Sequence, residues 1–221
     1  MATKAIIFDL WNTLAYNKGA GKNPILMLEE KLGLNMDLYR EVEQGFMTKK
    51  FGTKKEAMIS LCKHIGVKPR DMLIDSLVYM WEHMQLNVSL FPDVVPVLQK
   101  LRKKYKIGLI SNTECFTTKE FLDKGYGKHF DYIAFSCDLG MLKPDPSIFR
   151  VTMHELGSKP EETVMVGDNL MDDVLAAEKL GMKGLLIKRD FAKYGAKPSH
   201  LESGTHKNVI RDLTELQDYL D

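Results

Sequence analysis

The chain has 221 residues, of which 44% are hydrophobic and 28% are charged, so it can bury one sizeable core and carry an additional lobe. Lysine and arginine total 31 against 30 acidic residues, and the formal net charge of +1 argues against nucleic-acid binding and against attachment to an anionic membrane. The three cysteines, Cys62, Cys115 and Cys137, follow no disulfide or zinc spacing. They are typical of reduced thiols, and with no signal-peptide pattern at the start we expect a cytoplasmic protein.

The first predicted element is a strand. The apolar run Ala5–Phe8 ends at Asp9, as expected of a strand buried on both faces of a parallel sheet. From Pro24 to about Leu90 the apolar residues follow helical spacing instead and predict four amphipathic helices. The breaks between them are short, which favours antiparallel neighbours in a bundle, and fall at 33–35, 51–53 and 66–69.

After Phe91 the pattern alternates between helix and strand, which predicts a parallel sheet with helices on both faces. A helix through Val94 to Leu101 comes first, a closing helix is expected over Leu213–Leu220, and 191–207 is interpreted as an irregular surface segment. The predicted strands are Ile107–Ile110, Tyr132–Phe135, Thr163–Val166, Gly184–Ile187 and Val209–Ile210.

The helical stretch is flanked by pieces of one α/β core. The sequence therefore predicts an α/β protein with a Rossmann-like, three-layer parallel sheet built from 1–16 and 91–221. An α-helical cap of the four-helix bundle type, 17–90, is inserted into this core.

Polar residues of one chemical theme follow the predicted strands. They are Asp9, the run Ser111–Thr113, Gly167-Asp168 with Asp172-Asp173 one turn later, and Lys143. In an open parallel sheet ligands bind outside the carboxyl ends of the strands, so these side chains are expected to meet there. A nucleophilic carboxylate, hydroxyl and backbone N–H groups for an anion, and a lysine suit displacement at a phosphoryl group or at a carbon bearing a leaving group. Asp168 and Asp173 can share one hard cation, for which Mg2+ is the natural candidate.

At this point the sequence resembles the haloacid dehalogenase superfamily, with the α-helical cap of its first cap class. The four motifs that carry the resemblance are Ile7–Leu14, Leu109–Asn112, Lys143–Pro146 and Val166–Asp173. The resemblance implies that Asp9 forms a covalent intermediate, that Ser111 binds the substrate anion, and that Lys143 neutralises Asp9 and the bound group. It also implies a Mg2+ held by Asp9, Asp168 and Asp173 and by the backbone carbonyl of Trp11.

The substrate-binding residues implied by these motifs form a larger set. They are Trp11, Asn12, Thr13, Ser111, Asn112, Thr113 and Lys143. The expected partner is a small molecule, either a phosphorylated metabolite or a haloacid, and the expected protein is a monomer or a homodimer.

Trp11 departs from the pattern. In the phosphatases of the superfamily this position holds a second aspartate, which serves as general acid and base; its loss typically costs about 10²–10⁴-fold in rate. Dehalogenases carry an aromatic residue here but lack the acidic pair that Asp168 and Asp173 form. Three functions therefore stay open, with a magnesium-dependent phosphatase favoured over a haloacid dehalogenase and over a weakly active or non-catalytic binder of a phosphorylated ligand.

The predicted cap offers cationic and aromatic residues for a haloacid, and we interpret them as ordinary surface and core residues. They are Arg40, Lys49, Lys50 and Trp81. Lys18 and Lys22 follow the first motif and are placed near a domain hinge or in a plain loop.

Overall fold

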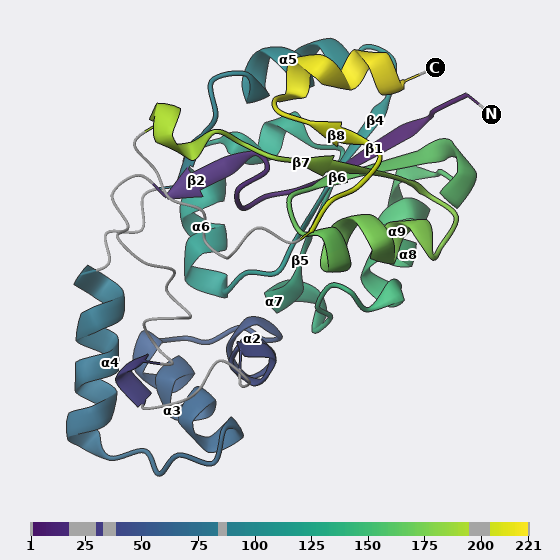
Figure 1. Ribbon diagram of the computed structural model, residues 1–221. Coiled ribbons are helices and arrows are strands. Elements are labelled where there is room, and N and C mark those ends of the chain that lie inside the picture. The colour runs from purple at the N-terminus through teal and green to yellow at the C-terminus, as the bar shows by residue number, and fades with distance from the viewer. Residues whose placement is uncertain (1, 18–29, 33–38, 84–87, 195–203, 221) are drawn as a thin grey trace.

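A computed structural model describes residues 2–17, 30–32, 39–83, 88–194 and 204–220 (Figure 1). Its main feature is a six-stranded sheet in the order β5-β4-β1-β6-β7-β8, in which all neighbouring strands run parallel. The strands are β1 (Ala5–Asp9), β4 (Lys106–Ser111), β5 (Tyr132–Phe135), β6 (Thr163–Gly167), β7 (Lys183–Ile187) and β8 (Val209–Ile210). All six strands expected from the sequence are confirmed.

The strand order makes β1 the centre of the sheet. The chain moves outward from β1 through β4 to β5, returns to the other side of β1 at β6, and continues outward through β7 to β8. The connections therefore leave in opposite directions between β1 and β6, and ligands bind at such a switch point in open α/β sheets. Asp9 ends β1 and Asp168 follows β6, so both residues flank this point.

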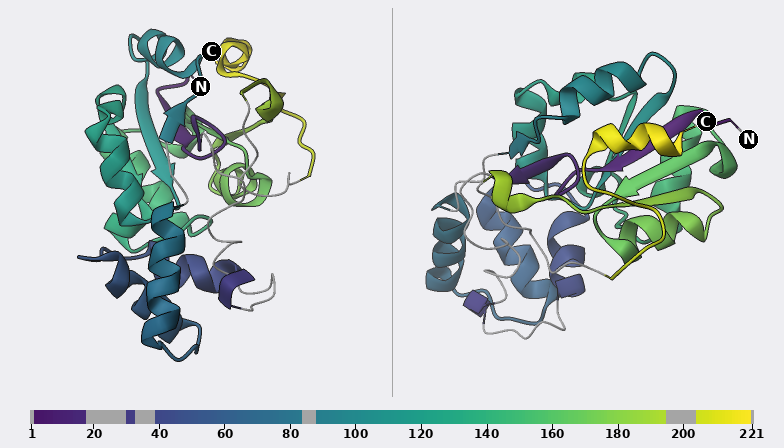
Figure 2. Two further views of the ribbon diagram at one scale, coloured as in Figure 1. Left: turned by 90° about the vertical axis from the view of Figure 1, so that its left-hand side faces the viewer. Right: turned by 45° about the horizontal axis from the view of Figure 1, so that its top comes forward.

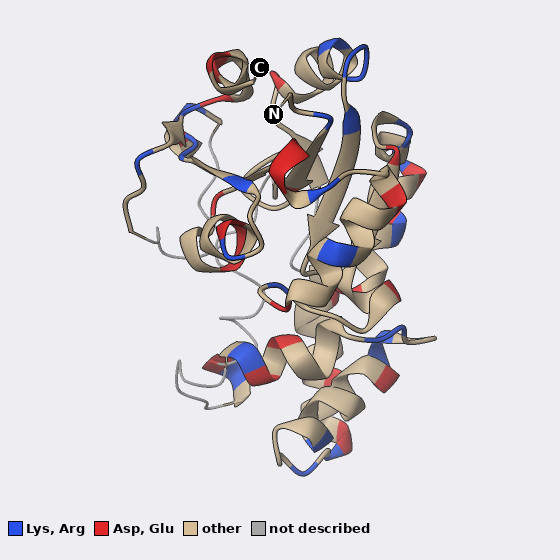
Figure 3. Cartoon of the chain, turned by 90° about the vertical axis from the view of Figure 1, so that its right-hand side faces the viewer, with Lys and Arg blue, Asp and Glu red and all other residues tan. Residues whose placement is uncertain are grey.

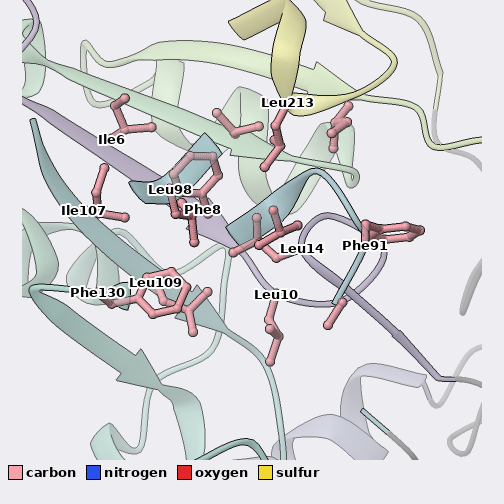
Figure 4. Packing of buried hydrophobic residues seen from close by; sticks show 14 of the residues in the cluster. Ile6, Phe8, Leu10, Leu14, Phe91, Leu98, Ile107, Leu109, Phe130 and Leu213 are labelled. Carbon is pink, nitrogen blue, oxygen red and sulfur yellow. The ribbon is translucent and has the colours of Figure 1, made fainter. Parts of the chain in front are cut away.

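Helices cover both faces of the sheet, as predicted. Both faces of the central strand β1 are apolar and are buried under these helices. Ile6 and Phe8 lie in one cluster with Leu98 of α5 (Val94–Leu101) and Leu213, as Figure 4 shows. Ala5 and Ile7 point to the opposite face, where they pack with α8 (Pro146–Leu156) and α9 (Ala176–Glu178). A strand that is buried on both sides reads as a continuous apolar run, which is why Ala5–Phe8 shows no alternation.

The remaining elements of the two helical layers are short. They are α6 (Cys115–Asp123), η2 (Tyr126–His129), α7 (Ser136–Leu139), α8 (Pro146–Leu156), η3 (Pro160–Glu162), η4 (Leu170–Leu175), α9 (Ala176–Glu178), η5 (Phe191–Tyr194) and η6 (Leu213–Tyr219). The predicted closing helix is confirmed as the 3₁₀-helix η6. None of the described helices is long and apolar enough to cross a membrane.

The inserted helices α2 (Tyr39–Met47), α3 (Lys54–His64) and α4 (Asp71–His83) form a group beyond one end of the sheet (Figures 1 and 2). They enclose a core of their own, in which Phe46 and Trp81 meet edge to face at 4.8 Å between ring centres. Of the four predicted helices, the first includes Glu30–Leu32, which are helical, and otherwise lies outside the described residues.

The helical pattern that the sequence predicts up to about Leu90 is wrong at its end, because Val88–Leu90 form a strand. After α4 the chain forms β3 (Val88–Leu90), which pairs antiparallel with β2 (Ala15–Asn17) in a separate two-stranded sheet. Three residues are too few for an alternating pattern to show, and the pairing joins segments that are far apart in the sequence. This ribbon links the sheet to the inserted helices at the place where the chain leaves the core and returns to it.

Arg189, just after β7, ties this connection to the core. Its guanidinium donates to the Thr13 carbonyl from Nε at 3.0 Å and from Nη2 at 2.8 Å, and Nη1 lies 2.7 Å from the Asp93 carboxylate. The Phe91 ring faces the guanidinium at 4.3 Å. Arg189 is buried, and its contacts with Thr13 and Asp93 join the segment that leaves the core to the segment that returns to it.

Replacing Arg189 with methionine should destabilise the protein by about 3–5 kcal/mol, because the Asp93 carboxylate, which is only 14% exposed, loses its cation. For a chain of this length the corresponding fall in Tm is roughly 6–20 °C. Thermal unfolding of Arg189→Met should be compared with Arg211→Met, whose side chain is exposed. Equal Tm values for the two variants would contradict this structural role.

Candidate active site

Asp9 lies at the centre of the candidate site and is only 5% exposed. Its Oδ1 atom is 2.5 Å from Lys143 Nζ, whereas Oδ2 is buried and has no hydrogen-bond partner within the described part of the chain. The next residues turn sharply, and Asn12 adopts the left-handed conformation with φ of 61°. Asparagine tolerates this conformation better than most residues.

Lys143 is buried between two carboxylates. Its Nζ atom lies 2.6 Å from Asp173 Oδ1 in addition to its contact with Asp9. The backbone of Lys143 is fixed by the Asn112 side chain, whose Oδ1 accepts from Lys143 N at 2.8 Å and whose Nδ2 donates to Lys143 O at 3.1 Å. Asn112 was predicted to bind substrate, and in this arrangement its amide orients the lysine.

The loop after β6 brings the acidic pair to the site. Asp173 folds back over the strand end, where its Oδ2 accepts from Asn169 N at 3.0 Å. A Cβ atom at Gly167 would lie 2.2 Å from the same carboxylate oxygen, so only glycine fits at this position. Asp168 accepts from Asn12 Nδ2 at 2.9 Å, which joins the first and fourth motifs.

The end of β4 contributes Ser111 and Thr113. Ser111 is fully buried, and its hydroxyl is without a hydrogen-bond partner among the described residues. Thr113 N donates to Ser136 Oγ at 2.9 Å, and its hydroxyl oxygen lies 3.5 Å from the Trp11 indole nitrogen. The unpaired Ser111 hydroxyl beside Asp9 is suited to bind an oxygen of an anionic ligand.

Carboxylate oxygens of Asp9, Asp168 and Asp173 all lie within 4.8 Å of one another. These residues fit a divalent cation by two criteria, since the donors are hard oxygens and the buried Asp9 Oδ2 has no other described partner. Lys143 is the cation that contacts two of the three carboxylates, so the cluster keeps an excess of negative charge. The ligation by the Trp11 carbonyl stays a prediction.

Burial dominates the electrostatics of this cluster. It raises the pKa of Asp9 and raises that of Asp173 to about 6, and in both cases the Lys143 ammonium offsets part of the effect. Burial opposes the charge on Lys143, but the two carboxylates outweigh it and raise its pKa. The two carboxylates therefore favour the protonated form of Lys143.

The helix α2 adds residues that the motifs do not include. Arg40 forms an ion pair with Asp172 and donates to the Lys143 carbonyl at 3.3 Å, so it bridges the inserted helices and the core. One turn later Glu43, which is 5% exposed, accepts from Arg40 Nη1 at 3.0 Å. No sequence pattern points to Glu43, because it lies at the edge of the apolar face that Val42 and Phe46 form.

The other cationic and aromatic residues named for a haloacid ligand do not join Arg40. Trp81 is buried in the core of the inserted helices, Lys50 pairs with Asp138 at 3.0 Å, and Lys49 lies over the Phe51 ring. Lys18 and Lys22 lie outside the described residues.

Charged residues of both signs are interspersed along the elements drawn in Figure 3. This distribution agrees with the small net charge of the chain. The functionally relevant charge is therefore local, at the carboxyl ends of β1 and β6.

Comparison with known proteins points to one family. Residues 3–181 match the family model described as haloacid dehalogenase-like hydrolase. Among relatives, a glyceraldehyde 3-phosphate phosphatase of Methanopyrus kandleri is 31% identical over 84% of both chains, and one of Methanothermobacter thermautotrophicus is 27% identical over 98% of this chain and 99% of its own. Among solved structures, a HAD phosphatase from Thermococcus onnurineus has a TM-score of 0.59 at 25% identity and covers 98% of this chain and 97% of its own.

Glu43 should make the stability of the protein depend on pH. Burial raises its pKa from 4.5 to about 7, although Arg40 opposes the shift. The favourable contribution of the neutral carboxyl is complete below pH 4.5 and is lost as the pH rises through about 7. Glu43→Gln avoids this loss, so its free energy of unfolding relative to the parent should increase by roughly 2 kcal/mol between pH 5.5 and 8.5.

Urea unfolding at both pH values measures this difference. Glu155→Gln, which changes an exposed glutamate on α8, serves as the control and should show no comparable dependence. If the two variants follow the same curve, Glu43 titrates normally.

Proposed function

This chain belongs to the haloacid dehalogenase-like hydrolase family, and from that premise we propose that it is a magnesium-dependent phosphatase of a small phosphorylated metabolite. The observation that carries the proposal is the cluster of Asp9, Asp168 and Asp173. A nucleophile that displaces a halide needs no cation, whereas three converging carboxylates beside a single lysine favour a divalent metal ion. The glyceraldehyde 3-phosphate phosphatases among the relatives support the same reaction class.

In the proposed reaction Asp9 attacks the phosphorus atom through one oxygen of its carboxylate and forms an aspartyl phosphate. The bond from phosphorus to the ester oxygen breaks, and water then hydrolyses the acyl phosphate to release inorganic phosphate. Lys143 keeps Asp9 ionised and offsets the charge of the phosphoryl group, and the Ser111 hydroxyl donates to one of its oxygens. When bound by Asp9, Asp168 and Asp173, Mg2+ would further neutralise the phosphoryl oxygens.

We propose that substrate access is governed by the insert. The proposed domains are a core of 1–16 and 91–221 and an α-helical cap of 17–90. The contacts of Arg40 with Asp172 and with the Lys143 carbonyl support closure of this cap over the strand ends. A closed cap excludes water from the first step and orients the leaving group.

A dehalogenase is the second candidate, and Trp11 is the observation that favours it. The indole is not titratable and cannot supply the proton that an aspartate supplies in phosphatases. A protein that binds a phosphorylated ligand without turnover is the third candidate, for the same reason. Activity measurements separate the three.

The parent protein should hydrolyse p-nitrophenyl phosphate in the presence of Mg2+, because a good leaving group needs little help from an acid. Asp9→Asn should lower kcat by at least about 10³-fold, since the amide is a poor nucleophile. A folded variant is confirmed by an unchanged circular dichroism spectrum. Chloride release from 2-chloropropionate in excess EDTA, with phosphate esters untouched, would establish the dehalogenase instead.

Asp168→Asn should weaken Mg2+ binding by at least about tenfold, because one charged ligand becomes neutral. The parent Tm should rise with millimolar Mg2+, as expected when a ligand binds only the folded state, and this rise should be lost in the variant. Asp190→Asn, on the exposed surface, should keep the parent response. A Mg2+-induced shift that survives Asp168→Asn would place the cation elsewhere.

A further inference from the structure

The reaction proposed above lacks a proton donor for the leaving group. An alkyl phosphate releases an alkoxide unless an acid protonates it, and the loss of such an acid typically costs about 10²–10⁴-fold. Trp11 occupies the position next to Asp9 that an acid would need, and its indole nitrogen is turned toward Thr113. Another buried titratable group near the strand ends could supply this proton.

Glu43 is such a group. It lies on α2, the inserted helix that approaches the strand ends, and Figure 1 shows α2 next to α7 at that end of the sheet. Only two hydrogen bonds separate its carboxylate from the backbone of Lys143, one of 3.0 Å to Arg40 and one of 3.3 Å from Arg40 to the Lys143 carbonyl. The ammonium of the same lysine contacts Asp9. Arg40 thus connects Glu43 to the backbone of the lysine that contacts Asp9.

The contacts of Glu43 suit proton transfer. Arg40 donates to Oε2, and the described residues give Oε1 no hydrogen-bond partner, so this oxygen is available to hold a proton. Burial with the nearby Asp172 charge favours the neutral acid near pH 7, where an acid must be both protonated and able to release its proton. The charged groups that act on Glu43 are Arg40, Asp172 and Lys143, and Arg40 pairs with Asp172 as well.

We propose that Glu43 is the general acid and base of this enzyme and replaces the function that Trp11 cannot perform; the proposal rests on the phosphatase function proposed above. As the phosphorus–oxygen bond breaks, neutral Glu43 gives its proton to the ester oxygen and the alcohol leaves. The resulting carboxylate then takes a proton from the water that attacks the aspartyl phosphate on Asp9. Inorganic phosphate departs, and Asp9 and neutral Glu43 are restored. Arg40 is a positioning residue that orients the Glu43 carboxyl group.

Glu43→Gln tests the proposal through the dependence on the leaving group. With an alkyl ester such as glyceraldehyde 3-phosphate, the variant should release the alcohol at least about 10²-fold more slowly than the parent. With p-nitrophenyl phosphate, rapid mixing should show a burst of p-nitrophenol within about threefold of the parent rate, because this leaving group needs no proton. The burst should be followed by slow turnover, since the second step lacks its base.

Glu41→Gln is the matched control, because Glu41 lies on the same helix and its side chain is 55% exposed. It should leave both esters unaffected. An equal loss in the rate of the first step, measured as alcohol release from the alkyl ester and as the p-nitrophenol burst, would mean that Glu43 only supports the fold of the site, and it would overturn the assignment alone. A parent protein inert towards both esters would overturn the proposed function and the assignment of Glu43 with it.

Discussion

The ion pairs of Lys143 with Asp9 and Asp173 are the interaction on which the rest of the structure depends. All three side chains are at most 7% exposed, and leaving one buried charge without a partner costs about 3–5 kcal/mol. The lysine follows β5, one aspartate ends β1, and the other follows β6, so the charges can pair only when three separate strands are in register. Packing of the sheet and assembly of the site are therefore one event.

The same cluster is incomplete as it stands. One ammonium faces three carboxylates, and Asp9 Oδ2 and Ser111 Oγ are buried without described partners. Buried polar atoms are seldom left in this condition unless a ligand completes them. A cation would complement the excess of carboxylate oxygens, and a phosphoryl group would complement the Ser111 hydroxyl.

The inserted helices reach the site through the side chains of α2. Arg40 reaches the core through Asp172 and the Lys143 carbonyl, and it carries Glu43 with it on the next turn of α2. The proposed proton transfer by Glu43 would thus depend on the position of the inserted helices. The proposed donor on α2 would link protonation of the leaving group to the exclusion of water.

The sequence by itself determined the core and the motif residues. Ala5–Phe8 predicts a strand buried on both faces because a doubly covered strand has no polar side, and Gly167 and Asp173 belong to one contiguous motif. Local patterns of this kind depend on neighbours along the chain, and they sufficed for all six strands and for the convergence of Asp9 with Lys143.

Only the tertiary structure decided the contacts between distant segments. Three such contacts join residues that share no periodicity. They are the pairing of β2 with β3, the contacts of Arg189 with Thr13 and Asp93, and the contact of Glu43 with Arg40. Each depends on where the chain returns after the insert, and three-residue strands or a single charged side chain on a helix leave no repeating signal. Burial, which raises the pKa of Glu43, is a property of the packed molecule and is not encoded in any one stretch of sequence.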